Sequence, residues 1–132
     1  MFSLPLDSAT GRQLLSDYYA DYARIAASAA SGLMLESPTW RANRDWGRRL
    51  GYDGVALTRL NRAAVALLRD LAQERADAVP RTLVSGMIGP RGDGYQAEAR
   101  MGAQESADYH RAQVDALAGA DLVHRGDRWA VA

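Results

Sequence analysis

The most constraining feature of the sequence is a short apolar run that ends in a glycine-rich loop. Residues Thr82–Ile88 read T-L-V-S-G-M-I, and the next seven residues, Gly89–Tyr95, contain three glycines and Pro90. An apolar run of this length, bounded by turn residues, is typical of a buried strand. Parallel α/β folds place their functional loops where strands end. We therefore expect the fold to be organised around this strand and the loop that follows it.

The sequence on either side of this strand predicts alternating helices and strands. Helical periodicity covers residues 10–30, 54–76 and 103–118, while short apolar runs at 33–35 and 120–123 predict two further strands. Strands separated by helices imply βα units and a parallel sheet. The expected fold is α/β, with about three parallel strands and three helices.

The spacing of apolar residues predicts which helical faces are buried. In the first helix the predicted buried face consists of Leu14, Leu15, Tyr18, Tyr22, Ile25 and Ala29. In the long second helix it consists of Val55, Leu57, Leu60, Ala64, Leu67, Leu68 and Leu71. Residues 40–52, rich in arginine and tryptophan, are either a loop with a short helix that covers a substrate or a packed surface excursion.

Composition excludes several classes of function. Sixteen arginines balance sixteen acidic residues, so net charge gives no argument for a nucleic-acid or membrane partner. The chain contains no cysteine, which excludes disulfides, thiolate zinc sites and cysteine nucleophiles. No apolar run reaches the roughly 20 residues of a membrane-spanning helix, and the start lacks a signal-peptide pattern. We expect a soluble cytoplasmic protein.

The carboxyl ends of parallel strands meet at one edge of a sheet, which is where α/β enzymes place their sites. This topology predicts that Glu36, Ser37, the loop Gly89–Tyr95 and His124 share one rim. His110 falls within a predicted helix and is interpreted as structural. Two histidines far apart in sequence do not predict a metal site.

Four segments of the sequence form recognisable motifs: L-E-S-P-T-W-R-A at Leu35–Ala42, D-W-G at Asp45–Gly47, R-L-G-Y-D at Arg49–Asp53 and S-G-M-I-G-P-R-G-D-G-Y at Ser85–Tyr95. Together they resemble the homocysteine S-methyltransferase family. The similarity continues to Val123. It implies a (β/α)8 TIM barrel, of which 132 residues can form only part, because such barrels need about 250 residues.

The resemblance also implies a reaction, which is methyl transfer to the thiol of homocysteine in methionine biosynthesis. In that family a zinc ion held by three cysteines activates the thiol. The candidate substrate-binding residues that follow from it are Glu36, Ser37, Thr39, Trp40, Gly89, Arg91 and Asp93. We assign no catalytic residue and no metal ligand, because the zinc cysteines have no counterpart in this chain. The expected small-molecule partner is homocysteine-like.

The chain departs from the family pattern after Val123. We expect residues 1–123 to form a partial barrel and residues 124–132 to form a divergent polar tail, as in a truncated or frameshifted product that is inactive alone. The alternative is a non-catalytic α/β module that works only with a partner chain. Open sheet edges predict self-association. The inner face of the sheet is expected to include some of Met34, Val84, Gly86, Ile88 and Leu122.

Overall fold

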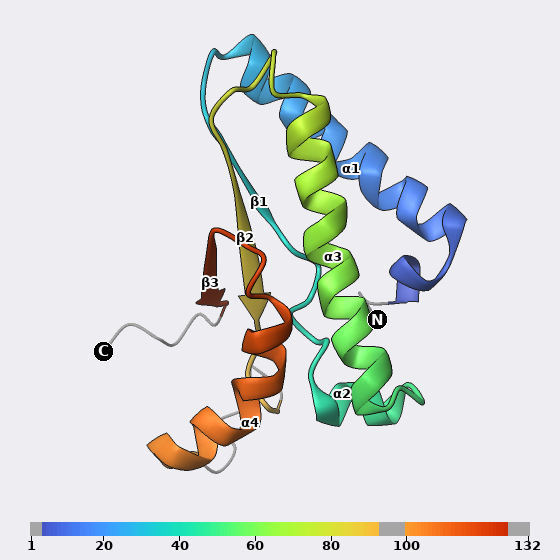
Figure 1. The fold of residues 1–132 in the computed structure, drawn as a ribbon, viewed down its shortest axis with the longest axis vertical. Helices are drawn as coiled ribbons and strands as arrows, with labels where there is room; N and C mark the ends of the chain where they lie inside the picture. Colours follow the sequence, from blue (N-terminus) through green and yellow to red (C-terminus); the bar gives the residue numbers. More distant parts are fainter. Residues whose placement is uncertain (1–3, 93–99, 127–132) are drawn as a thin grey trace.

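A three-stranded parallel sheet with helices beside it makes up the fold of the computed structural model (Figure 1), which describes residues 4–92 and 100–126. The strands, in the order β1-β2-β3, are β1 (Leu33–Glu36), β2 (Thr82–Ile88) and β3 (Leu122–Arg125). The helices are α1 (Ala9–Ser28), α2 (Arg44–Arg49), α3 (Gly54–Glu74) and α4 (Ala103–Ala116), preceded by a 3-10 helix, η1 (Leu4–Asp7). The predicted alternation is confirmed, and α2 lies within residues 40–52, where a short helix was one of the two expectations.

Polar side chains define where three of the helices begin. Ser8, Asn43 and Asp53 each accept a hydrogen bond from a backbone N–H of the first helical turn, at the starts of α1, α2 and α3. Helix α1 ends at Ser28, two residues before the end of the predicted span 10–30, and Ala30 takes the left-handed conformation with φ +51°.

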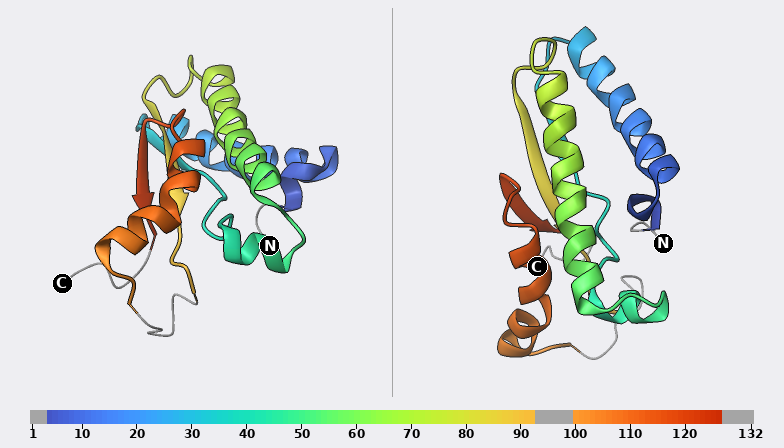
Figure 2. Two further views of the ribbon diagram at one scale, coloured as in Figure 1. Left: turned by 60° about the horizontal axis from the view of Figure 1, so that its bottom comes forward. Right: turned by 45° about the vertical axis from the view of Figure 1, so that its right-hand side comes forward.

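One face of the sheet packs against the helices (Figure 2). Leu35 and Val84 are paired in register on this face, and both belong to the same core cluster as Leu68 of α3 and Leu117, which follows α4. All four are at most 3% exposed. Burying one such side chain contributes about 1.5–3 kcal/mol, so this cluster supplies much of the stability of the fold.

The opposite face of the sheet carries no described helix. Met34 and Leu122 lie on this face and are 49% and 36% exposed. Both were among the five candidates for the inner face of the sheet. Val84, Gly86 and Ile88 are on the helix side instead. Side chains alternate between the two faces along a strand, so Val84, Gly86 and Ile88 share one face. Leu83, one position before Val84, lies on the opposite, open face.

The predicted buried face of α1 is wrong except at Leu15, which packs against the core. Ala29 is exposed, and four larger side chains have exposed fractions between 48% and 66%: Leu14, Tyr18, Tyr22 and Ile25. The buried positions are Gly11, Tyr19, Ala23 and Ala26. Small side chains and one tyrosine allow α1 to lie close to its neighbours, and the Tyr19 hydroxyl donates to the backbone oxygen of Glu36 at 2.6 Å.

The predicted face of α3 is largely confirmed. Leu57, Leu60, Ala64, Leu68 and Leu71 are buried and Leu67 is partly buried, whereas Val55 is 80% exposed. Asn61 and Val65 are also buried and were not predicted. The Asn61 amide is satisfied there, donating to the backbone oxygens of Ala42 and Leu57. Within the described ranges, no helix is long and apolar enough to cross a membrane.

Candidate functional site

The carboxyl ends of β1, β2 and β3 meet at one edge of the sheet (Figure 1). Parallel pairing places Glu36 opposite Ser85, and Met87 opposite His124. The segments that leave this edge begin at Ser37 after β1, at Gly89 after β2 and at Gly126 after β3. This is the edge at which parallel α/β folds bind ligands, and it is the rim predicted from the topology.

Three polar side chains form a chain of contacts across this edge, on the face of the sheet that the helices leave open. The Ser85 hydroxyl lies 2.6 Å from Nδ1 of His124. Nε2 of His124 lies 3.4 Å from Oε1 of Glu36. A neutral imidazole can accept the serine proton at Nδ1 while its Nε2–H points to the carboxylate. The contacts therefore join all three strands.

Exposure separates the roles of these three side chains. Ser85 is fully buried, whereas the Glu36 and His124 side chains are 42% and 32% exposed. A ligand at this edge can reach the carboxylate and the imidazole but not the hydroxyl, which orients the imidazole. A carboxylate beside an imidazole can bind an ammonium group or exchange a proton.

His124 was expected on the rim but as the first residue of the tail, and Ser85 was not among the predicted site residues. His124 and Arg125 belong to β3, so this strand continues two residues beyond Val123, where the predicted strand ended. The sequence did contain a signal that the strand continues, because Leu122 and His124 extend a period-two alternation beyond Val123. The same period places Ser85 on the side of the sheet shared by Leu83 and Met87.

Ser37 and Thr39 connect the loop after β1 to the end of β2. Thr39 Oγ1 donates to the backbone oxygen of Met87 at 2.6 Å, and Ser37 Oγ accepts from the Met87 N–H at 2.9 Å. The two hydroxyls lie 2.6 Å apart, and both residues are at most 2% exposed. Each hydroxyl is thus satisfied inside the protein, where it holds the loop in place. Their contact with a substrate stays a prediction.

Trp40 and Gly89 bring the three segments at the rim together. The Trp40 Nε1–H donates to the backbone oxygen of Gly126, and the Gly126 N–H donates to Ile88 at 2.9 Å. A Cβ added at Gly89 would lie 2.2 Å from the backbone oxygen of Trp40. Only glycine permits this approach, so Gly89 sets the packing of the first loop against the second.

Arg91 is engaged by two carboxylates. Its guanidinium lies 3.1 Å from Asp45 and 3.0 Å from Glu105, and also stands over the ring of Tyr109. Burial raises the pKa of Tyr109 to about 12, and its hydroxyl donates to Asn43 at 3.0 Å. The cluster joins α2 and α4. Substrate binding by Arg91 stays a prediction, and Asp93 lies outside the described residues.

The residues of this chain do not fit a three-thiolate zinc site. The sequence has no cysteine, and the part of the chain that the structure describes contains no group of three His, Cys, Asp or Glu side chains that could hold a metal ion. The pairing of Glu36 with His124 supplies at most two donors. The described residues therefore do not provide the metal site that the family resemblance implies.

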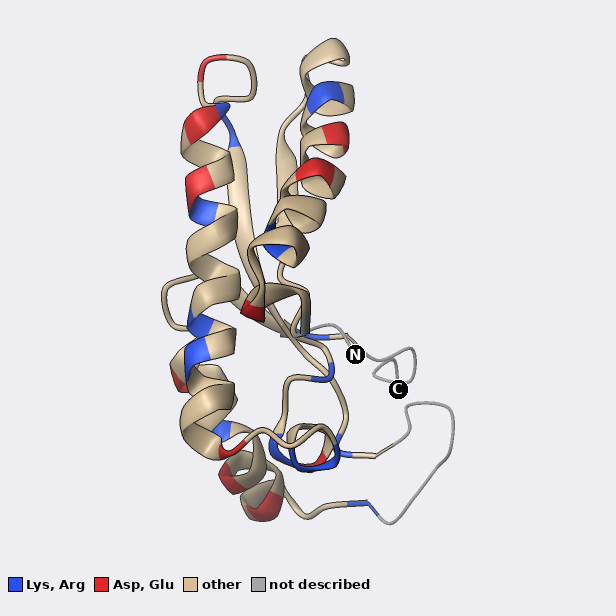
Figure 3. Ribbon diagram, turned by 90° about the vertical axis from the view of Figure 1, so that its right-hand side faces the viewer, with Lys and Arg blue, Asp and Glu red and all other residues tan. Residues whose placement is uncertain are grey.

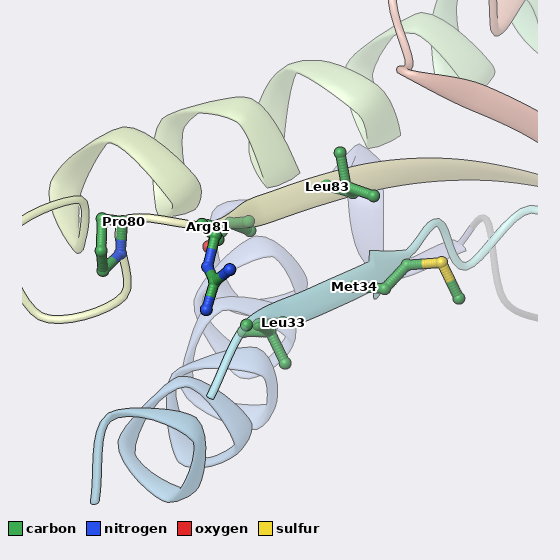
Figure 4. Close-up of a pocket in the computed structure, with 7 residues that line it drawn as sticks. Leu33, Met34, Pro80, Arg81 and Leu83 are labelled. Atoms are coloured by element: carbon green, nitrogen blue, oxygen red, sulfur yellow. The ribbon is translucent and has the colours of Figure 1, made fainter. Parts of the chain in front are cut away.

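A hollow lies at the opposite end of the sheet, where β1 and β2 begin (Figure 4). Its lining residues include Leu33, Met34, Pro80, Arg81 and Leu83. Met34 and Leu83 are the exposed apolar side chains of the open sheet face, so this hollow is part of that face. It lies at the amino ends of the strands, where parallel folds rarely bind substrates.

A family model described as homocysteine S-methyltransferase matches residues 4–124. The chain belongs to this family. The match includes Glu36, Ser37, Thr39, Trp40, Gly89 and Arg91, and it ends at His124 within β3. The resemblance seen in the sequence is thereby confirmed.

Two solved structures of the homocysteine methyltransferase MmuM from Escherichia coli share the fold. The metallated form has a TM-score of 0.66 and the oxidised form 0.73, each at 24% sequence identity. This chain is covered to 88% and 89%, but spans only 41% and 42% of those chains. No curated protein sequence matches the chain. The three parallel strands and their helices are therefore part of a (β/α)8 barrel, as expected.

Proposed function

We propose that this chain supplies part of a homocysteine S-methyltransferase barrel, and that its strand edge helps to bind a homocysteine-like amino acid. The observation that carries the proposal is the family match over residues 4–124. The polar edge formed by Glu36 and His124 supports it, because an exposed carboxylate is suited to the ammonium group of an amino acid. Methionine biosynthesis in the cytoplasm is the process to which such a reaction would belong.

In this proposal the sequence candidates have two kinds of role. Glu36 contacts the amino acid, while Ser37, Thr39, Trp40 and Gly89 shape the loops around it through the contacts described above. Arg91 and Asp93 remain candidates for substrate binding because the family resemblance includes them.

The chain alone is proposed to be inactive. A free thiol has a pKa of about 8.5, so little of the acceptor is thiolate at neutral pH unless a metal or a base lowers that value. This chain offers no thiolate ligands for zinc. The matched structures are more than twice as long, and the residues that complete a barrel lie outside the present sequence.

The test is a methyl-transfer assay with homocysteine and a sulfonium methyl donor, in which methionine is measured by mass spectrometry. The chain alone should give no product above background. Addition of a zinc-loaded fragment carrying the remaining strands of a family barrel should restore turnover, and E36Q should reduce it. Turnover by the chain alone, lost in E36Q, would show that a zinc-free mechanism operates here.

The second candidate function is that of a non-catalytic module that associates with another chain. The open face of the sheet favours it, because Met34, Leu83 and Leu122 expose between 36% and 50% of their surface there. Self-association through this face and the strand edges is part of the same candidate. Sedimentation of the purified chain over a range of concentrations distinguishes a monomer from such an assembly.

A further inference from the structure

A concentration of positive charge lies directly after β1, on and beside α2 (Figure 3). Residues 41–49 contain four arginines and one acidic residue, which gives a formal charge of +3 in a chain whose net charge is zero. The arginines are Arg41, Arg44, Arg48 and Arg49. The one carboxylate, Asp45, already forms an ion pair with Arg91.

None of these four arginines forms an ion pair with a carboxylate in residues 4–92 or 100–126. The arginines that do form ion pairs with aspartate or glutamate lie elsewhere: Arg24, Arg59, Arg69, Arg91 and Arg111. The ε nitrogen of Arg41 is also buried without a hydrogen-bond partner. The net positive charge of residues 41–49 is therefore not neutralised by other described residues.

Aromatic rings hold two of these arginines in place. The guanidinium carbon of Arg41 lies 4.4 Å from the centroid of the Trp46 ring, and that of Arg49 lies 4.7 Å from the same centroid. Arg41 also stands 5.1 Å from the ring of Trp40. A guanidinium over a ring keeps its in-plane N–H donors available for an oxyanion. Contact with the ring also limits the rotamers that binding would have to restrict.

We propose that Arg41 and Arg49, positioned by Trp46, form a binding site for a small ligand with two or more phosphate or carboxylate groups. Two guanidinium groups near one ring repel each other, and a multivalent oxyanion that contacts both offsets that repulsion. The site does not depend on methyl transfer, because its residues are separate from the open face that carries Glu36 and His124.

A small ligand fits the site better than a nucleic acid does. Binding of single strands uses bare aromatic rings on which bases stack, along a positively charged groove. Here two guanidinium groups stand over the Trp46 ring, and Arg44 and Arg91 stand over the ring of Tyr109. The charge excess is also confined to one short segment of a neutral chain.

The test is isothermal titration of the full chain with pyrophosphate and with citrate, each at constant ionic strength. The variants are R49Q, R41K and R41Q/R49Q, and the matched control is R62Q, which removes an exposed charge from α3. We expect one or both ligands to bind, with affinity reduced at least tenfold in R41Q/R49Q and within twofold of the unmodified chain in R62Q. R41K should weaken binding although it keeps the charge, since lysine lacks the planar fork.

The two ligands distinguish the sources of the oxyanion. Binding of pyrophosphate alone would assign a phosphate ligand, and binding of citrate alone would assign a polycarboxylate. Far-UV circular dichroism checks that each variant is folded. If R41Q/R49Q does not fold, the single variant R49Q replaces it in the test, because Arg49 is exposed and its substitution should not disturb folding. No binding of either ligand below millimolar concentration, or an equal loss in R62Q, would overturn the proposal.

Discussion

Asp121 holds three elements together at the start of β3, and its removal is a direct test of how the sheet is joined to α3. Its carboxylate accepts two hydrogen bonds of 2.9 Å from the Arg69 guanidinium in α3. It also accepts a hydrogen bond of 2.7 Å from the Val84 N–H in β2. Arg69 donates in addition to the backbone oxygen of Gly119, at 2.8 Å and 3.1 Å. We expect substitution of Asp121 to destabilise the fold.

The magnitude follows from exposure and from the kind of bond lost. The Arg69 and Asp121 side chains are 41% and 32% exposed, so solvent screens their attraction and the ion pair is worth about 0.2–1 kcal/mol. The bond from the Val84 N–H to a charged group is worth about 1.5–3 kcal/mol. D121N keeps an oxygen that can accept from Val84 and should cost about 1 kcal/mol, whereas D121A leaves that N–H unpaired and should cost about 2–3 kcal/mol.

The effect should depend on pH in a definite direction. The hydrogen bonds from Arg69, followed by that from the Val84 N–H, lower the pKa of Asp121 below its ordinary value. A group whose pKa is lower in the folded state stabilises the fold above its unfolded pKa, about 3.9 for aspartate. That contribution is lost as the pH falls through the folded value. The gap between the unmodified chain and D121N should therefore shrink below about pH 4.

The assay is urea unfolding followed by far-UV circular dichroism at pH 7, 4 and 3. D70N is the matched control, because Asp70 is an exposed carboxylate on α3 and its removal should change the free energy of unfolding by less than about 0.5 kcal/mol. If D121N destabilises no more than D70N at pH 7, or if its effect persists undiminished at pH 3, the reasoning is refuted.

The remaining predictions concern metal, packing and assembly. The purified chain should keep no stoichiometric zinc after dialysis, measured by elemental analysis, because it has no thiolate ligands. L68A should lower the free energy of unfolding by about 2–5 kcal/mol, since Leu68 is fully buried in the core, and a smaller loss in urea melts would contradict the packing described. G89A should destabilise because its Cβ would meet the Trp40 backbone, and a Tm equal to that of the matched G102A would count against this. Light scattering at micromolar concentration should detect species larger than a monomer, and a monodisperse monomer would exclude assembly through the open sheet face.

The strands and the order of elements were predictable because their signals are local. The run Thr82–Ile88 and its glycine loop were enough to locate β2 and the rim of the candidate site. The side-chain contacts within the candidate site were not predictable in the same way. The chain from Ser85 through His124 to Glu36 depends on the register of three strands, and register is set by packing between segments nearly 40 and 50 residues apart.

The misassigned face of α1 shows where periodicity alone is insufficient. Two stripes of this helix are apolar, and the larger side chains, such as Leu14, Tyr18 and Ile25, lie on the exposed one. The spacing and size of these side chains led to the prediction that this stripe is buried. In the structure the buried stripe consists of Tyr19 and small residues. A helix that is apolar on both sides is ordinarily covered on both sides. This chain spans about two-fifths of the matched structures. An exposed apolar stripe on a helix is expected wherever the helix or strand that would pack against it is not part of the present sequence. The periodicity thus identified a face suited to burial in a more complete barrel, and the exposed face of α1 supports the partial-barrel interpretation.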